Sequence, residues 1–350
     1  MPEQIAVVQV GLGALGRRLT PFLLERLYLR VVGAVDPDPG LVGRDVGEVA
    51  EIGRLLGVAV SPDVRAALSR TSAAVAIQTT VSSLAEAKGQ VEELLDCGLS
   101  VVSSCEELSY PWQAAPEISA DLDCHAREAG KAVLATGVNP GFLMDYLPLV
   151  LTGICREVRK VTVLRCQDAR FRRLPFQRKI GAGLTLPQFE RRKAEGSLRH
   201  VGLTESMHMI ASRLGWRLDR TEDIIEPIIA AEPVSSDHIA VAAGAAAGVR
   251  QLGLGYVGGQ ERIRLEFRAA IGEPDVRDTV IIEGEPPLQF TTAGGVNGDT
   301  ATCAILTNAI RTVAAAPPGL WTMADLPITT WSADKHSTAS ERTGSGQQEP

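Results

Sequence analysis

The sequence has few of the residues that mark nucleic-acid or membrane partners. Aromatic residues make up only 4% of the 350 residues and are scattered, so they offer no platform on which bases would stack. The 35 lysines and arginines are outnumbered by 42 aspartates and glutamates, and the net charge of −7 disfavours binding to phosphate backbones or anionic lipid. Every apolar stretch is shorter than the roughly 18 residues that cross a bilayer. We therefore expect neither a nucleic-acid nor a membrane partner.

Cysteine and histidine are also few, and they are not spaced as metal ligands. The six cysteines include no Cys-x-x-Cys pair, so in a chain of this length we expect reduced core residues. The five histidines form no His-x-x-x-His or His-Glu-x-x-His pattern, so no metal site is expected. The apolar residues 5–10 lead straight into glycines without the basic flank or cleavage site of a signal peptide, which predicts a cytoplasmic protein.

The first 140 residues alternate short β-branched runs with longer helical patterns. This alternation predicts a Rossmann-type doubly wound parallel sheet with helices on both faces, in a domain spanning residues 1–140. A chain of 350 residues exceeds what one hydrophobic core usually serves, so a second domain is expected. The expected strands are 5–10, 31–36, 73–79, 100–104 and 132–136, and the expected helices are 15–26, 43–56, 83–97 (capped by Ser82 or Ser83) and 116–129.

After Asn139-Pro140-Gly141 the pattern changes to that of an α+β domain, which we place at residues 141–297. Its open sheet could pair with a second subunit, so a homodimer is expected. Residues 298–331 contain a C-terminal helix that should pack back on the first domain, and the polar residues 332–350 are expected to be a disordered tail. The expected strands here are 158–167, 224–232, 249–256, 262–271 and 279–284, and the expected helices are 187–195, 204–214 and 299–314.

A glycine-rich turn gives the strongest local signal for a ligand. Gly11, Gly13 and Gly16 form a G-x-G-x-x-G motif that follows an expected strand and opens an expected helix, the context that dinucleotide binding requires. Gly11 permits the tight turn, Gly13 lets the backbone approach a diphosphate, and Gly16 allows close helix–strand packing. The helix dipole favours the diphosphate charge. We therefore expect NAD or NADP to bind at Gly11, Leu12, Gly13, Ala14, Leu15 and Gly16.

The end of the second strand carries a candidate for choosing between the two cofactors. Asp36 lies 20 residues after Gly16, where a carboxylate can accept hydrogen bonds from the adenosine ribose and so favour NAD. Arg17 and Arg18 stand nearby and could instead bind the 2′-phosphate of NADP. These residues alone do not decide between NAD and NADP.

Ligands of doubly wound sheets bind outside the carboxyl ends of the strands. Three segments lie there, and from them we expect cofactor contacts by Thr79, Thr80, Ser103, Cys105 and Asn139. The middle segment also holds two adjacent carboxylates, Glu106 and Glu107, beside apolar and aromatic residues. A carboxylate in such surroundings can exchange protons near neutral pH, although a solvated pair that caps the next helix is the alternative.

The residues around the change of pattern are candidates for the substrate pocket. Phe142, Leu143 and Met144 could form its wall, although apolar residues after a turn also serve as ordinary core. His200 could reach the pocket or be purely structural. Asn139 could bind the nicotinamide amide, orient a carboxylate, or simply precede Pro140 in a turn. The basic run at residues 170–179 could bind an anion or form a solvated face.

Several segments in combination carry a family resemblance: Cys105-Glu-Glu-Leu-Ser-Tyr-Pro, Lys179-Ile-Gly-Ala-Gly-Leu-Thr, His200-Val-Gly-Leu-Thr-Glu-Ser, Gly298-Asp-Thr-Ala-Thr, Asn308-Ala-Ile and Pro318-Gly-Leu-Trp-Thr-Met-Ala-Asp-Leu-Pro. Together they resemble the 2,4-diaminopentanoate dehydrogenases and the related native amine dehydrogenases, from about residue 5 to 328. The N-terminal domain of that family resembles dihydrodipicolinate reductases. The resemblance implies NAD(P)-dependent oxidative deamination of a small primary amine, reversible as reductive amination of a ketone with ammonia.

The resemblance further implies that a glutamate of the Cys-Glu-Glu loop transfers the proton, with Glu106 favoured over Glu107, and that Asn308 contacts the cofactor. Three other functions remain open: a diaminopentanoate (amino-acid) dehydrogenase, an oxidoreductase like homoserine dehydrogenase or dihydrodipicolinate reductase, and a non-catalytic redox sensor. Spacing does not reveal whether any arginine points inward to meet a substrate carboxylate.

Overall fold

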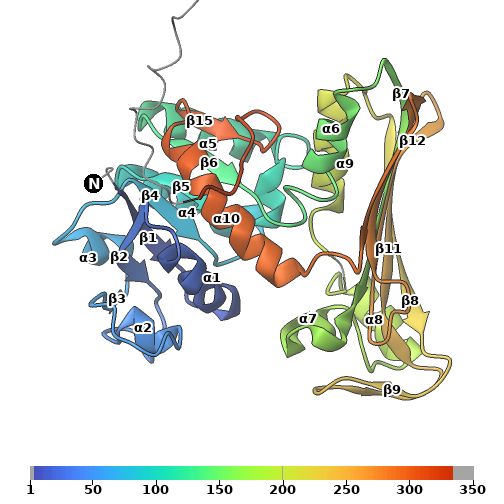
Figure 1. Ribbon diagram of the computed structural model, residues 1–350, viewed down its shortest axis with the longest axis horizontal. Helices are drawn as coiled ribbons and strands as arrows, with labels where there is room; N and C mark the ends of the chain where they lie inside the picture. The colour runs from blue at the N-terminus through green and yellow to red at the C-terminus, as the bar shows by residue number, and fades with distance from the viewer. Residues whose placement is uncertain (1–3, 199, 334–350) are drawn as a thin grey trace, which may run out of the picture.

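The computed structural model describes residues 4–198 and 200–333 and contains two packed sheets (Figure 1). Seven parallel strands with helices on both faces form the first domain, and a six-stranded mixed sheet forms the core of the second. The predicted doubly wound domain and the second α+β domain are both confirmed. Within the described residues, no helix is both long and apolar enough to cross a membrane.

The first sheet has the strand order β15-β6-β5-β4-β1-β2-β3. The chain adds β2 and β3 on one side of β1, then crosses to add β4, β5 and β6 on the other. The order therefore reverses between β1 and β4, where the strand ends leave a crevice for a ligand. The strands are β1 (Ile5–Val10), β2 (Leu29–Val35), β3 (Val60–Ser61), β4 (Val75–Gln78), β5 (Ser100–Ser103), β6 (Ala132–Ala135) and β15 (Gly319–Trp321).

Two layers of helices cover this sheet because its central strands are apolar on both faces. One layer is formed by α4 and α5, and the other by α1 and α10, which pack against each other. The C-terminal segment thus returns to the first domain, as predicted for its helix. The helices are α1 (Ala14–Leu24), α2 (Val46–Val49), α3 (Val64–Leu68), α4 (Leu84–Asp96), α5 (Pro116–Glu128) and α10 (Gly298–Ala314).

The long helix predicted at residues 43–56 is wrong, since only the short α2 forms there. The cause is Asp45, whose carboxylate accepts hydrogen bonds from the backbone N–H groups of Gly47, Leu56, Gly57 and Val58. These bonds fold the segment back on itself and lower the pKa of Asp45, despite the desolvation that opposes them. The edge strand β15, which pairs with β6, was not predicted at all.

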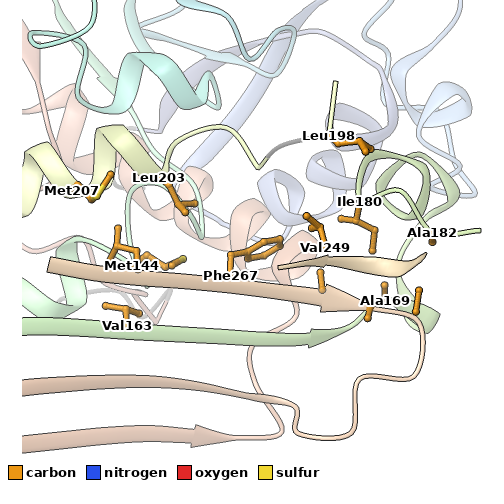
Figure 2. Close-up of a cluster of buried hydrophobic side chains, with 14 of the residues drawn as sticks. Met144, Val163, Ala169, Ile180, Ala182, Leu198, Leu203, Met207, Val249 and Phe267 are labelled. Atoms are coloured by element: carbon orange, nitrogen blue, oxygen red, sulfur yellow. The ribbon is translucent and has the colours of Figure 1, made fainter. Parts of the chain in front are cut away.

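The second sheet has the order β14-β13-β7-β12-β11-β8, in which only β7 and β12 run parallel. Helices lie against one face, and the other face is bare in Figure 1. Figure 2 shows the core beneath them, where Met207 and Leu203 of α9 face the strands that carry Val163 and Phe267. The strands are β7 (Glu157–Asp168), β8 (Arg220–Ile229), β11 (Ala246–Val257), β12 (Gln260–Ala270), β13 (Arg277–Glu285) and β14 (Leu288–Ala293).

The predicted strands of this domain are confirmed except that β14 and a small separate pair of strands were missed. The short helices α6 and α7 were missed as well, because each has too few turns to show a periodic pattern. The remaining elements are β9 (Val234–Ser235), β10 (Ala240–Val241), α6 (Tyr146–Thr152), α7 (Leu174–Lys179), α8 (Leu186–Ala194), α9 (Leu203–Arg213) and two short 3-10 helices, η1 (Glu106–Ser109) and η2 (Ala169–Phe171). Of the predicted tail 332–350, residues 334–350 lie outside the described part of the chain.

Candidate active site

A cavity of about 340 Å³ lies between the two domains, lined by both. The first domain supplies the start of α1 and the carboxyl ends of β4, β5 and β6, and the second supplies the inner face of β7, β11 and β12. Of the residues predicted from sequence, those that line it are Gly13, Ala14, Leu15, Thr79, Thr80, Cys105, Glu106, Asn139 and His200. The lining also includes Arg172, Arg173 and Lys179 of the basic run for which anion binding was one of two interpretations. It further includes polar and charged residues that were not predicted to line a site: Arg165, Gln167, Asp299 and Thr302.

The glycine turn has the geometry expected of an anion-binding loop. A Cβ on Gly16 would lie 2.0 Å from the carbonyl oxygen of Gly11, so only glycine fits between helix and strand. Gly11 has a φ of 89° in the left-handed region, which glycine adopts without strain. By contrast, a Cβ on Gly13 would meet nothing within 4 Å. The cavity therefore leaves space beside Gly13 for a ligand.

The start of α1 is free to receive a negative charge. Its N-cap residue, Gly13, has no side chain to satisfy the first N–H groups, and no acidic residue stands in the first turn. These N–H groups and the helix dipole together attract an anion such as a diphosphate. The residues present thus fit the phosphates of a dinucleotide, which would supply the hydride acceptor when bound.

Asp36 is tied to the same turn. Its Oδ2 accepts a hydrogen bond of 2.8 Å from the N–H of Leu12, and its Oδ1 accepts one of 3.0 Å from the N–H of Asp38. Neither nearby arginine meets the carboxylate: the Nε of Arg17 donates to the carbonyl of Leu12, and Arg18 reaches Thr300 on α10. Asp36 is therefore placed at the end of β2 beside the turn, without a cation that would neutralise it.

The two adjacent glutamates have different surroundings. Glu107 caps α4, because its Oε2 accepts a hydrogen bond of 2.8 Å from the N–H of Leu84, while Ser83 makes no capping bond. Ser83 stands at the N-cap position, as one of the two expected serines, but its side chain does not supply the capping bond. Glu106 lines the cavity, and its carboxylate has no hydrogen-bond or ion-pair partner among the described residues. Of the pair, Glu106 is the group available to a ligand.

The remaining predicted residues at the ends of β4 and β5 are held by hydrogen bonds close to the glycine turn. The Oγ1 of Thr79 donates to the carbonyl of Gly11, and that of Thr80 donates to Gln90. Ser103 is buried outside the cavity lining, where it donates to Gln78 and accepts from the N–H of Cys105. Burial raises the pKa of the Cys105 thiol to about 12, so this cysteine stays protonated and is no nucleophile.

Asn139 presents an unsatisfied amide to the cavity. It is 7% exposed, and both its Oδ1 and Nδ2 are buried without a hydrogen-bond partner in the described structure. The turn that carries it is fixed by Asp145, whose carboxylate accepts bonds from the N–H of Gly141 and the Oγ of Ser206. Desolvation raises the pKa of that buried carboxyl. A buried amide left unpaired is costly, which indicates that a polar ligand completes it.

Four predicted residues lie away from the cavity. Phe142 packs beside Tyr146 near the first sheet, and Met144 is fully buried in the core of the second domain. Leu143 lines a separate void of about 10 Å³. Asn308 is on α10, two turns beyond the residues of that helix that reach the cavity. The structure therefore does not bring Phe142, Leu143, Met144 or Asn308 to the site.

Arg165 is the residue that sequence reasoning missed most clearly. It is 2% exposed on the inner face of β7, with its Nε 3.7 Å from Asp278 and its Nη2 donating to the carbonyl of Val296. Its Nη1 has no partner among the described residues. Desolvation lowers its pKa to about 10, so the guanidinium stays charged at neutral pH. The alternation of β7 could have predicted that Arg165 points inward, because residues 161, 163 and 165 lie on the same, buried face of the strand.

His200 lines the same cavity, near enough to Arg165 to be affected by its charge. Its ring lies 4.6 Å from the ring of Phe267, its backbone N–H donates to Gln251, and its Nδ1 is buried without a partner in the described structure. Desolvation, together with the nearby charges of Lys179 and Arg165, lowers its pKa to about 3. The imidazole is therefore neutral at physiological pH and offers one donor and one acceptor.

This low pKa makes His200 a source of acid sensitivity. A histidine has a pKa of about 6.5 when unfolded, so folding favours its neutral form, and the stability it confers is lost as pH falls from about 6.5 towards 3. Between pH 7 and 5 the wild type should lose about 2 kcal/mol more than His200→Gln. Urea unfolding of both proteins at the two pH values measures this difference. Equal losses would contradict the placement of His200.

Comparisons with known proteins show the family to which the chain is similar. A family model described as the 2,4-diaminopentanoate dehydrogenase C-terminal domain matches residues 142–341. The chain is also 31% identical to a 2,4-diaminopentanoate dehydrogenase of Acetoanaerobium sticklandii, over 93% of this chain and 94% of the relative. The chain belongs to the 2,4-diaminopentanoate dehydrogenase family.

Two further relatives carry the name amine dehydrogenase. One, from Streptomyces virginiae, is 28% identical over 93% of this chain and 96% of its own length. The other is a solved amine dehydrogenase from Mycobacterium smegmatis, 26% identical, with a TM-score of 0.83 over 95% of this chain and 98% of that structure. The resemblance expected from the sequence motifs is thereby confirmed, and this member of the family has the same architecture in both domains.

Proposed function

We propose that this member of the family is an NAD(P)-dependent dehydrogenase that deaminates a primary amine and, in reverse, aminates a ketone with ammonia. The observation that carries the proposal is the free carboxylate of Glu106 in one cavity with the uncapped start of α1. The glycine turn, Asp36 and the unpaired amide of Asn139 support dinucleotide binding, with Thr79, Thr80 and Cys105 forming the adjoining wall.

The chemistry that this proposal requires divides between cofactor and protein. When bound, the dinucleotide would supply the hydride acceptor for the amine carbon. Before hydride loss, the Glu106 carboxylate takes a proton from the substrate ammonium and passes it to solvent, because only the neutral amine can donate its electron pair to the iminium that hydride loss leaves on the substrate. The same carboxylate then takes a proton from the water that adds to the iminium and returns it to the nitrogen, and a ketone and ammonium are released.

The far end of the cavity supports a substrate that also carries a carboxylate. Arg165 has one unpaired nitrogen there, and His200 adds a neutral imidazole with an unpaired Nδ1. A buried guanidinium with a free donor is poorly satisfied by a plain alkyl chain but matches a carboxylate well. We therefore propose an amino acid as substrate, with the amine beside Glu106 and the carboxylate at Arg165. A plain alkyl amine is the second candidate, favoured by the bidentate pairing of Arg172 with Asp299.

A panel of amino acids and alkyl amines, assayed with NAD and NADP, tests this proposal through the absorbance of reduced cofactor. We expect amine-dependent cofactor reduction, fastest with diamino acids and slower with alkyl amines of the same length. Cofactor binding without reduction by any amine would favour a redox sensor. Turnover of hydroxyl substrates in place of amines would favour a homoserine-dehydrogenase-like enzyme.

Cofactor choice is expected to favour NAD, because the Asp36 carboxylate is close to the glycine turn and neither Arg17 nor Arg18 pairs with it. Asp36→Ala should improve the NADP:NAD ratio of kcat/KM by about tenfold, since it removes repulsion of the 2′-phosphate and a hydrogen-bond acceptor for the ribose. Asp38→Ala is the matched control, because Asp38 stands two residues away in the same exposed loop. A ratio that does not move in Asp36→Ala would place this carboxylate outside the adenosine site.

We also propose that two copies pair through the bare face of the second sheet. That face carries several ion pairs, such as those of Arg250 with Glu226 and Glu266, beside partly exposed apolar residues such as Ile224 and Leu164. A homodimer would cover these apolar side chains. Light scattering on the purified protein should give twice the mass of the 37.2 kDa chain, and a monomer mass would overturn this pairing.

A further inference from the structure

Three guanidinium groups converge on the single carboxylate of Asp299, which is 6% exposed. Arg172 pairs with both of its oxygens, through Nη2 at 3.0 Å and Nε at 3.2 Å. The Nε of Arg173 lies 3.5 Å from Oδ1, and the Nη1 of Arg18 lies 3.8 Å from Oδ2. The cluster therefore contains one negative and three positive charges, and its net charge is +2.

This cluster belongs to the cavity and not to the outer surface. Asp299, Arg172 and Arg173 line it together with Gly13 and Ala14. Arg18 is on the same helix as Ala14, one turn further along, so its contact with Asp299 brings the cluster close to the start of α1. The excess positive charge and the uncapped N–H groups of α1 therefore border the same space.

The three arginines differ in how many donors they have free. Arg172 uses Nε and Nη2 for Asp299 and Nη1 for Gln167, and its guanidinium lies 3.9 Å from the ring of Phe176. Arg173 is joined to Asp299 only through Nε, and 40% of its side chain is exposed. Both Nη groups of Arg173 are thus available to a ligand, whereas Arg172 is held in place and helps to fix Asp299.

We propose that Arg173 binds the diphosphate of the dinucleotide from the second domain, opposite the start of α1. This inference rests on the proposed function, because it takes the ligand to be a dinucleotide. An anion with two negative charges offsets the two uncompensated cations, and guanidinium N–H groups match phosphate oxygens in geometry. The unpaired amide of Asn139, which is 7% exposed in the same cavity, is independent support for a polar ligand there.

The proposed contact also links the two domains. The glycine turn belongs to the first domain, whereas Arg173 precedes α7 in the second. A diphosphate held from both sides would bring the substrate-binding residues Arg165 and His200 to a fixed position relative to the cofactor. Binding of the dinucleotide would then order the substrate end of the cavity before the amine arrives.

The test compares Arg173→Gln with Arg178→Gln. Arg178 is an exposed arginine of α7, the helix that Arg173 precedes, and it does not line the cavity. Calorimetry with ADP-ribose, which carries the diphosphate but no nicotinamide, measures binding without catalysis. We expect the Kd for ADP-ribose to rise about tenfold in Arg173→Gln, the size of one charge-assisted hydrogen bond at a partly exposed site, and to stay unchanged in Arg178→Gln. The Kd should also become less sensitive to salt in Arg173→Gln. Adenosine, which lacks phosphates, should bind all three proteins alike.

Wild-type affinity for ADP-ribose in a folded Arg173→Gln protein would overturn the inference. So would a variant in which only the KM for the amine rises, because Arg173 would then serve the substrate carboxylate. Failure of the wild type itself to bind ADP-ribose and NAD is a separate result, which would overturn the proposed dehydrogenase function.

Discussion

Replacing Glu106 by glutamine should lower kcat for amine oxidation by about 10²- to 10⁴-fold, the usual contribution of a general acid or base. Glutamine keeps the shape of the side chain but cannot take a proton from the substrate ammonium. The Kd for NAD should stay near the wild-type value, because Glu106 has no partner in the described structure that the substitution would disturb. Stopped-flow measurement of cofactor reduction, together with a binding titration, separates the two effects.

Glu107→Gln is the matched control, since it makes the same chemical change one residue along. The amide oxygen can still accept from the N–H of Leu84, so α4 keeps its cap, and activity should fall far less than in Glu106→Gln. If Glu107→Gln alone abolishes turnover, the proton-transfer role belongs to Glu107. If both variants remain fully active in both reaction directions, the carboxylate mechanism is wrong.

Replacing Arg165 by glutamine should lower kcat/KM for an amino-acid substrate by at least about 30-fold, since truncating one partner of a buried charge pair costs about 2–5 kcal/mol. An alkyl amine without a carboxylate should lose little or nothing. The two substrates, assayed on one protein preparation, therefore act as controls for each other.

The substitution also leaves Asp278 buried without its cation, which could destabilise the fold. Burial raises the pKa of the Asp278 carboxyl even with Arg165 present. The double variant Arg165→Gln/Asp278→Asn removes both charges and should recover stability while keeping the substrate defect. An unchanged kcat/KM for amino acids in the folded double variant would show that the carboxylate binds elsewhere.

Sequence reasoning found the parts of the fold whose signal is local. The patterns around the glycine turn were sufficient, because its strands are short continuous apolar runs and α1 buries one face, so each element shows its type in its own residues. The loop around Asp45 could not be found in this way, since its shape depends on one carboxylate that gathers N–H groups up to 13 residues away. Strand β15 has only three residues, and it pairs with a strand nearly 190 residues earlier in the chain.

The part of the site that the first domain contributes was largely predicted from the sequence. Strand ends of a parallel sheet meet at one edge, so Thr79, Cys105, Glu106 and Asn139 could be grouped without a structure. On the other side of the cavity, the basic run at residues 170–179 was only one of several candidates for binding an anion. Arg165 and Asp299 could not be placed, because only the packing of the two domains brings their segments to this edge. Phe142 and Met144 follow Asn139 directly in the chain, but the turn fixed by Asp145 directs them into two different cores.

The return of α10 and β15 to the first domain has a consequence for synthesis of the chain. Leu306 and Ile310 of α10 pack into the same core as Val7 and Leu19, so the residues made first lack part of their core until those made last have left the ribosome. The second domain is in effect an insertion that is translated before its host is finished. Because Asp299 and Thr302 also line the cavity, a nascent chain that has reached the end of the second domain still has an incomplete site. The protein can therefore bind a ligand in this cavity only after synthesis of α10, when the first domain can complete its fold.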